Sequence, residues 1–253
     1  MQLNGQAAIV TGGASGLGEA TARAFAARGA HVIIADRDLA KANAVASAIG
    51  GRAIQVDVSD AASAQALFGQ LASDGIVPRV LVNCAGIAVA KRMVGRDGPM
   101  GLEEFSRIIN VNLIGTFNMM RLAGHAMSLA APLEGGERGV IISTASVAAF
   151  EGQIGQSAYA ASKGGVVALT LPIARELAQF GVRVLAIAPG LFKTPLLAEL
   201  PEEAQASLAS AIPNPRRLGA PEEFASLACH MVENAYLNGE VVRIDGALRM
   251  APR

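Results

Sequence analysis

The sequence contains no tryptophan, only two tyrosines and only two cysteines among its 253 residues. Two isolated cysteines, Cys84 and Cys229, cannot build the disulfide framework of a small secreted protein, so a reducing compartment is expected. Lys plus Arg and Asp plus Glu both number 21, so no excess charge predicts binding to nucleic acid or to an anionic membrane. The three histidines are scattered without metal-ligand spacing, and we expect no metal site.

Long apolar runs are also missing, and none reaches the length needed to span a bilayer. The start, MQLNGQAAIVTGG, has no basic region followed by a long apolar stretch, so we expect no signal peptide. We therefore expect a cytoplasmic protein without a membrane anchor, or a mitochondrial matrix protein if the source is eukaryotic. A composition that is 52% hydrophobic excludes a disordered chain and supplies a large core.

Seven short apolar runs alternate with longer helix-like segments. The runs show no alternation of apolar and polar residues, which is typical of strands buried on both faces of a parallel sheet. Strands are predicted at 7–11, 31–36, 52–56, 80–83, 139–144, 183–188 and 240–245, and helices at 18–28, 39–49, 61–73, 102–127, 157–179 and 221–233. This order predicts an α/β protein with a single doubly wound, Rossmann-type domain over residues 1–253. Its sheet is expected to be seven-stranded and mostly parallel, with helices on both faces.

Three segments break this alternation. Residues 91–101 and 131–139 are rich in glycine and are predicted to be loops. Residues 191–221 form a long connection with a short helical piece, and they follow the carboxyl end of a predicted strand. Open α/β sheets bind ligands at that end, so we expect 191–221 to be a substrate lid.

The first predicted strand runs into TGGASGLG, residues 11–18. Gly13 and Gly18 have the spacing of a phosphate-binding P-loop, but Glu19 follows where that loop needs lysine, so we do not expect a nucleotide triphosphatase. Gly12, Gly16 and Gly18 do not match the ordinary G-x-G-x-x-G pattern either. They still let the backbone approach a pyrophosphate at a helix N-terminus, which favours a dinucleotide over a plain turn.

The second predicted strand ends in an acidic residue, Asp36. A carboxylate at this point accepts a hydrogen bond from a ribose 2′-hydroxyl and repels a 2′-phosphate, so NAD is favoured over NADP. Arg37 follows at once and is the one residue that favours the phosphate.

Tyr159 and Lys163 are four residues apart on a predicted helix and share one face. A nearby ammonium favours the phenolate, which brings a tyrosine toward the range useful for acid–base catalysis. Ser146 follows the strand at 139–144, and its hydroxyl is placed to donate to a substrate oxygen. The alternatives are a tyrosine at a helix edge with a solvated lysine, and a serine that caps a turn.

Asn112 lies on a stripe of the predicted helix 102–127 that also carries Phe105, Ile109, Thr116 and Met120. An amide on a core-facing stripe must find hydrogen-bonding partners. It is therefore either a satisfied structural asparagine or a group that organises a water or a backbone carbonyl near the lysine.

In order along the chain, the motifs are TGGASGLG, Asp57-Val58, NCAG (83–86), Asn112, Ser146, Tyr159-x-x-x-Lys163 and APG (188–190) with Thr194. Together they resemble the short-chain dehydrogenase/reductase family over essentially the whole chain. TASVAAFEGQIGQSAYAASKGG, LPIARELA, IAPGLFKTPLL and LNGEVVRIDGALRM narrow the resemblance to members that act on 3-hydroxyacyl-CoA and hydroxysteroids.

The resemblance implies NAD as cofactor and assigns residues to it. The cofactor-binding residues it implies are Gly12, Ser15, Gly16, Leu17, Gly18, Asp36, Asp57, Val58, Cys84, Gly86, Tyr159, Lys163, Phe192 and Thr194. It further implies that Tyr159 is the acid–base, that Ser146 and Gln153 face the substrate, and that Asn112 completes a proton relay through water to Lys163.

The expected reaction is the interconversion of a secondary alcohol and a ketone. The expected substrate is an (S)-3-hydroxyacyl-CoA, including 2-methyl-branched forms, with hydroxysteroids as side substrates. Two alternatives stay open at this point: an NADPH-dependent 3-oxoacyl-carrier-protein reductase, and a nucleotide-binding scaffold subunit. The resemblance also implies a homotetramer built on the helices at 102–127 and 157–179 and on the last strand.

Overall fold

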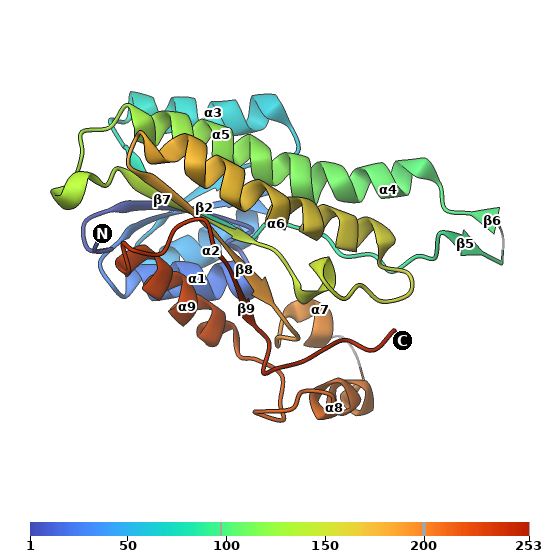
Figure 1. The fold of residues 1–253 in the computed structure, drawn as a ribbon. Coiled ribbons are helices and arrows are strands. Elements are labelled where there is room, and N and C mark those ends of the chain that lie inside the picture. The colour runs from blue at the N-terminus through green and yellow to red at the C-terminus, as the bar shows by residue number, and fades with distance from the viewer. Residues whose placement is uncertain (97, 199–200, 253) are drawn as a thin grey trace.

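A computed structural model describes residues 1–96, 98–198 and 201–252. Its main sheet has seven strands, all parallel, in the order β3-β2-β1-β4-β7-β8-β9 (Figure 1). The strands are β1 (Ala7–Thr11), β2 (His31–Asp36), β3 (Arg52–Gln55), β4 (Pro78–Asn83), β7 (Gly139–Thr144), β8 (Val182–Pro189) and β9 (Val241–Ile244). Each lies within a few residues of its predicted position, and the predicted doubly wound fold is confirmed.

Helices cover both faces of the sheet (Figure 1). One face carries α1 (Gly16–Ala26), α2 (Leu39–Ile49) and α9 (Pro221–Glu233), and the other carries α3 (Ala61–Ser73), α5 (Gly115–Ser128) and α6 (Ser157–Ala178). None of the described helices is long and apolar enough to cross a membrane.

The strands divide their side chains between two cores. On β1, Val10 packs in the core beneath α1 and α9, and its neighbour Ile9 packs in the core beneath α3 and α5. Val82 and Leu81 of β4 are divided in the same way. Successive side chains of a strand point to opposite faces, so a strand covered on both sides must be apolar at every position. This requirement explains the uninterrupted apolar runs in the sequence.

The prediction of a single regular helix over 102–127 is wrong in one respect. The structure has α4 (Leu102–Ile109), then a π-helical turn (Asn110–Ile114), then α5. Within this turn the Gly115 N–H donates to Asn110 O, five residues back. The Thr116 hydroxyl donates to Asn112 O at 2.7 Å, and the Asn112 side chain is held from outside the helix. These bonds to side chains stabilise a wider turn that apolar periodicity does not reveal.

The three predicted irregular segments contain short elements. Residues 91–101 include the two-stranded hairpin of β5 (Val94–Gly95) and β6 (Gly98–Pro99), so they are not a plain loop. Residues 131–139 contain a 3₁₀ turn (Glu134–Gly136). Residues 191–221 contain two helices, α7 (Pro195–Ala198) and α8 (Glu202–Ser210), where one helical piece was predicted. Residues 199–200 of this predicted lid lie outside the described residues.

Candidate active site

A cleft of about 670 Å³ opens at the carboxyl ends of the central strands. Its walls include Gly12 after β1, Cys84 after β4, Ser146 after β7 and Gly190 after β8. The chain continues from β1 outward to β2 and β3, then returns to β4 on the other side of β1. This is the topological switch point at which open α/β sheets bind ligands.

Most of the predicted site residues meet in this cleft. Those that line it are Gly12, Ser15, Gly16, Leu17, Gly18, Asp36, Asp57, Val58, Cys84, Gly86, Ser146, Tyr159, Lys163, Phe192 and Thr194. Two predicted residues are not in the lining. Asn112 is fully buried behind the cleft, and the Gln153 side chain instead donates to Ala251 O at 3.0 Å.

The glycine loop between β1 and α1 depends on close backbone contact. Gly12 has a φ of +62°, and a Cβ there would lie 2.7 Å from Ala85 N. A Cβ on Gly18 would lie 2.2 Å from Gly12 O. Both positions therefore exclude side chains, which leaves the N-terminus of α1 open to the cleft.

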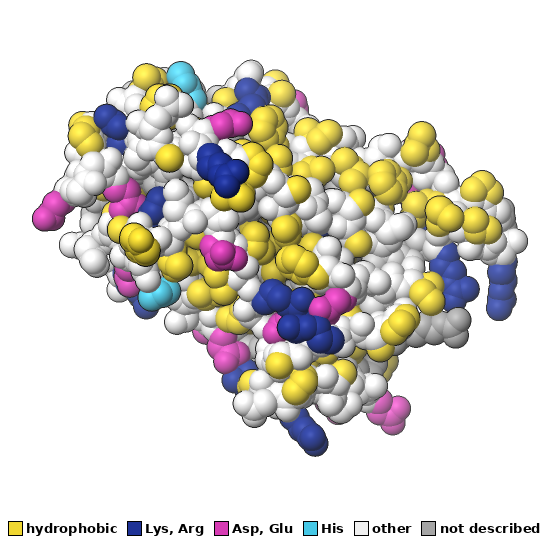
Figure 2. Space-filling model, viewed as in Figure 1, with side chains coloured by type: hydrophobic (Ala, Val, Ile, Leu, Met, Phe, Trp, Pro, Cys, Tyr) yellow, Lys and Arg dark blue, Asp and Glu magenta, His cyan; other side chains and the backbone are white. Residues whose placement is uncertain are grey.

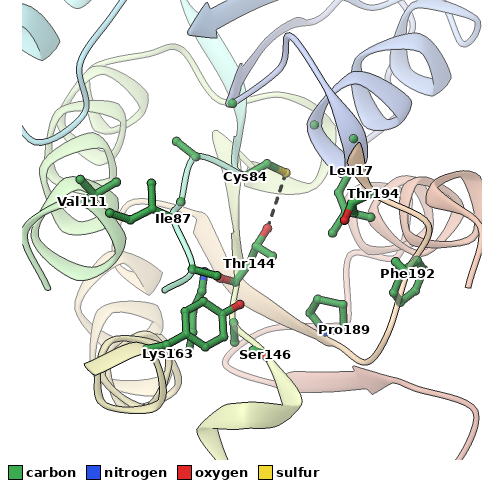
Figure 3. A pocket seen from close by; sticks show the side chains of 18 of the residues that line it. Leu17, Cys84, Ile87, Val111, Thr144, Ser146, Lys163, Pro189, Phe192 and Thr194 are labelled. Atoms are coloured by element: carbon green, nitrogen blue, oxygen red, sulfur yellow. Dashed lines mark hydrogen bonds between the residues drawn. The ribbon is translucent and has the colours of Figure 1, made fainter. Parts of the chain in front are cut away.

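Lys163 is held against the floor of the cleft and points toward it (Figure 3). It lies on α6, is only 5% exposed, and its Nζ donates to Thr144 O at 2.6 Å. Its Nζ also lies 5.8 Å from the centre of the Tyr159 ring. Burial lowers the pKa of Lys163 from 10.5 to about 8, because water no longer solvates the ammonium.

Tyr159 and Ser146 meet above this lysine. Burial raises the pKa of the Tyr159 phenol, and its hydrogen bond with Ser146 acts in the opposite direction. Ser146 Oγ accepts from Ala148 N at 3.1 Å, which fixes the serine at the start of a 3₁₀ turn (Val147–Ala149). Because that bond uses an oxygen lone pair, the hydroxyl proton of Ser146 remains available for a hydrogen bond to an oxygen in the cleft, and in this structure its partner is Tyr159.

Asn112 connects the exit of β4 to α6. Its Oδ1 accepts from Ile87 N at 2.8 Å, and its Nδ2 donates to Ile87 O at 2.9 Å and to Ser162 Oγ at 3.1 Å. Ser162 Oγ in turn donates to Tyr159 O at 2.7 Å. A Cβ on Gly86 would lie 3.2 Å from Asn112 Oδ1 and 3.7 Å from Lys163 Nζ, so the missing side chain leaves a space between amide and ammonium.

Comparison with known proteins agrees with this arrangement. Residues 6–205 match the family model described as short chain dehydrogenase. The chain belongs to the short-chain dehydrogenase family. It is 50% identical to the 3-hydroxyacyl-CoA dehydrogenase type-2 of Rattus norvegicus, over 99% of this chain and 97% of the relative. A crystal structure of a 3-hydroxyacyl-CoA dehydrogenase type-2 from Mycobacterium avium superposes with a TM-score of 0.93 at 46% identity and covers 98% of both chains. A 3-oxoacyl-[acyl-carrier-protein] reductase of Thermotoga maritima is more distant, at 35% identity over 98% of this chain and 99% of that protein.

Two carboxylates, Asp36 and Asp57, line the cleft of this short-chain dehydrogenase. Asp36 Oδ2 accepts from Ala14 N at 3.1 Å and its Oδ1 accepts from Asp38 N at 3.1 Å. Asp57 Oδ1 accepts from Ser59 Oγ at 2.6 Å, and this bond holds the pKa of Asp57 below its usual value. The Asp57 carboxylate therefore stays ionised at neutral pH and adds negative charge to the wall of the cleft.

Cys84 is the one thiol among the described residues that line the cleft of this family member. The Thr144 hydroxyl donates to its Sγ at 3.5 Å (Figure 3). Burial raises the pKa of Cys84 to about 11. The thiol is therefore neutral at physiological pH and is no nucleophile.

Sequence reasoning missed several residues that belong to the site of this family member. Gln156 lines the cleft three residues before Tyr159, a spacing that places both on one face where the chain enters α6. Thr144 and Ser162 supply the anchors of Lys163 and Asn112. Met250 also lines the cleft, and no local signal marks it because it arrives from the far end of the chain.

A methyl group at Gly18 tests the glycine loop. We expect Gly18→Ala to weaken NADH binding at least about tenfold and to lower the thermal midpoint, since overpacking costs about 1–3 kcal/mol. Gly69→Ala is the matched control, because a Cβ at that exposed position of α3 meets nothing within 4 Å. It should raise stability by about 0.5–1 kcal/mol. Equal effects of the two variants in calorimetry and fluorescence titration would contradict this view of the loop.

Proposed function

We propose that the protein is an NAD-dependent oxidoreductase that interconverts (S)-3-hydroxyacyl-CoA, including 2-methyl-branched forms, and 3-oxoacyl-CoA. The observation that carries this proposal is the meeting of Tyr159, Ser146 and Lys163 in one cleft of a chain about half identical to a 3-hydroxyacyl-CoA dehydrogenase type-2. The substrate class comes from that relative, and the chemistry comes from the three side chains.

The residues of the cleft fit a dinucleotide. Any side chain at Gly12 or Gly18 would fill the space between this loop and its neighbours, so the two glycines keep that space open. The open N-terminus of α1 beside it favours a pyrophosphate. The Asp36 carboxylate lies at the end of β2 and favours a free ribose 2′-hydroxyl. In our proposal Asp57 and Val58 hold the adenine, Cys84 and Gly86 line the cofactor cleft through their backbone, and a separate set holds the nicotinamide half. That set is Tyr159, Lys163, Phe192 and Thr194. The bound nicotinamide would accept hydride from the substrate in one direction and donate it in the other.

Tyr159 is the proposed acid–base. In oxidation its phenolate removes the hydroxyl proton of the substrate, and in reduction the phenol returns it. The Ser146 hydroxyl donates a hydrogen bond to the same substrate oxygen, which stabilises the developing charge. Phe192 keeps its place at the nicotinamide end because it is 5% exposed and packs edge-on against Phe224, with ring centres 6.5 Å apart.

Lys163 has two roles in this proposal. One of its three N–H groups is used on Thr144 O, which leaves two for the ribose and for the space beside Gly86. Its ammonium, with Nζ 5.8 Å from the centre of the Tyr159 ring, also favours the phenolate of Tyr159. We propose that Asn112 completes a proton relay through water in the Gly86 space, because its amide fixes the Ile87 peptide beside it.

Asp36 tests the cofactor preference. A charged hydrogen bond of this kind contributes about 1.5–3 kcal/mol, so we expect Asp36→Asn to lower the ratio of kcat/KM for NADH over NADPH by at least about tenfold. Asp74→Ala is the control, because Asp74 is exposed and pairs only with Arg52 among the described residues. A ratio unchanged in Asp36→Asn would show that Asp36 does not select the cofactor.

Two other functions remain as alternatives. The NADPH-dependent 3-oxoacyl-carrier-protein reductase is favoured by the exposed Arg37 and by the Thermotoga maritima relative, but that relative is the more distant one. A nucleotide-binding scaffold subunit would need neither Tyr159 nor Ser146. The presence of both beside Lys163 favours the enzyme.

The deciding experiment measures NADH consumption with acetoacetyl-CoA, with a parallel series in NADPH. Rapid turnover with NADH supports the acyl-CoA dehydrogenase. Turnover with NADPH alone favours the carrier-protein reductase. Binding of NADH without turnover of any 3-oxo compound favours the scaffold.

We also propose a homotetramer and a lid at 191–221. Apolar side chains spread over the face that carries α5 and α6 (Figure 2). Ile114, Phe117 and Leu171 on this side are each more than 40% exposed, which suits an interface between subunits. The lid proposal is supported by Leu191, Phe192, Thr194 and Leu197, which line the cleft.

A further inference from the structure

The C-terminal segment, residues 245–252, bridges two walls of the active-site cleft. On one side Asn214 N, in the segment proposed as a lid, donates to Gly246 O at 3.2 Å. On the other side Ile154 N donates to Pro252 O at 3.0 Å, in the loop that leads from Ser146 to Tyr159. In Figure 1 this segment ends beside that loop, which precedes α6.

Met250 is the residue of this segment that lines the cleft, together with Ser146 and Tyr159. Its half-buried side chain also packs against a small core of Ile212, Leu218 and Leu248. Met250 therefore joins the lid to the catalytic end of the cleft. An unbranched thioether adapts its shape to an irregular gap, which suits a wall that meets different hydrocarbon chains.

The Glu151 carboxylate fixes Met250 in place. Its Oε2 accepts from Met250 N at 3.1 Å, and its Oε1 accepts from Arg243 Nη1 at 2.8 Å. Arg243 is held in turn by Asp245 Oδ2 at 2.8 Å. Glu151 and Arg243 are each about 22–23% exposed in this pair, so the bonds are partly shielded from water.

We infer that Met250 determines how large a hydrocarbon chain the site accepts beyond the reacting carbon, and that Glu151 is its positioning residue. This inference rests on the proposed function. The surface of Met250 is apolar and continuous with the small core of Ile212, Leu218 and Leu248. It therefore suits the alkyl end of a 3-oxoacyl-CoA and not the charged CoA end.

The test compares chain-length preference in the full chain and its variants. The quantity is the ratio of kcat/KM for 3-oxodecanoyl-CoA over that for acetoacetyl-CoA, with NADH. Met250→Ala should raise this ratio about tenfold, because the change of a methylene in a pocket is worth about 10–200-fold. Met250→Phe should lower it. Leu248→Ala is the control: it should lower the thermal midpoint and leave the ratio unchanged, because Leu248 is buried in the same small core but does not line the cleft.

Variants of Glu151 test its positioning role. Glu151→Ala should shift the ratio in the same direction as Met250→Ala, through KM for the short substrate and with little change in its kcat. Glu151→Gln keeps an acceptor for Met250 N and should restore most of the wild-type ratio. The double variant Glu151→Ala/Met250→Ala should shift the ratio no further than Met250→Ala alone, because both act through one side chain.

The outcomes separate this inference from the proposed function. Wild-type turnover of acetoacetyl-CoA tests the function, and the ratio tests Met250. If no acyl-CoA is reduced, the proposed function is rejected. The ratio of kcat/KM for a long-chain over a short-chain substrate is then measured with a series of methyl ketones. The inference is overturned if wild type and Met250→Ala have equal ratios, or if Met250→Ala and Leu248→Ala shift the ratio equally. It is also overturned if neither the acyl-CoA series nor the methyl ketone series is turned over.

Discussion

Replacing Tyr159 with phenylalanine is expected to lower kcat with acetoacetyl-CoA and NADH by about 10³-fold, the usual contribution of a positioned acid–base. The ring and its packing remain, and only the proton donor is removed. The affinity for NADH, measured by fluorescence, should stay within about twofold, since Lys163 and its bond to Thr144 O remain in place.

The chain offers a matched control for this variant. Tyr236 is the only other tyrosine, and it is 99% exposed. Tyr236→Phe should leave kcat, KM and stability unchanged. Substantial turnover in Tyr159→Phe would show that another group transfers the proton. Loss of NADH binding would show that the Tyr159 hydroxyl is required to hold the cofactor.

Replacing Lys163 with methionine should lower activity and stabilise the fold at the same time. We expect kcat/KM to fall on the order of 10²-fold, because the phenolate loses its neighbouring charge. A pKa lowered from 10.5 to about 8 corresponds to a cost on the order of 3 kcal/mol for the buried ammonium. The lost bond to Thr144 O offsets part of this gain, at about 1.5–3 kcal/mol. A net gain of about 1 kcal/mol would raise the thermal midpoint by about 2–4 °C.

The pH dependence of the free energy of unfolding provides a second test of the lowered pKa of Lys163. Its pKa is about 8 in the folded protein and near 10.5 when unfolded. Between these values the unfolded state binds one proton more, so the contribution of Lys163 to stability rises with pH. The cost is fully present below pH 8 and disappears toward pH 10.5. The stability gap between Lys163→Met and wild type should therefore narrow as pH rises above about 8.

Lys41→Met serves as the control for this prediction. Lys41 is exposed on α2 and pairs with Asp38 at the surface. Its removal should change neither activity nor the slope of stability against pH. Denaturant titrations of the three proteins across this pH range give the comparison, and a constant gap for Lys163→Met would contradict a lowered lysine pKa.

Much of the fold was predictable because its signals are local. A parallel strand such as β8 (Val182–Pro189) is buried on both faces, so it appears in sequence as an apolar run. The glycine loop, Ser146 and the Tyr159–Lys163 pair follow strand ends or share a helix face, so their meeting in one cleft was predictable from topology.

Other parts depend on contacts between distant residues. The anchors Thr144 and Ser162 act through a backbone carbonyl and a side chain that no motif marks. Met250 lines the cleft at a point where Glu151, 99 residues earlier, accepts a hydrogen bond from its N–H. Gln153 was predicted to face the substrate, but its side chain lies against Ala251, because the C-terminal segment competes for its amide. Periodicity within a window cannot reveal such contacts.

The wide turn at Asn110–Ile114 couples the active site to the hydrophobic core through helix phase. Each residue of an α-helix advances the side-chain direction by about 100°. If the same residues formed a regular α-helix, the residues of α5 that pack on the sheet, among them Met119 and Met127, would rotate away from it. Keeping those residues in place would instead rotate Asn112 away from Ile87. With its residues unchanged, the helix can therefore become regular only by giving up either its core packing or the contact of the Asn112 amide with Ile87.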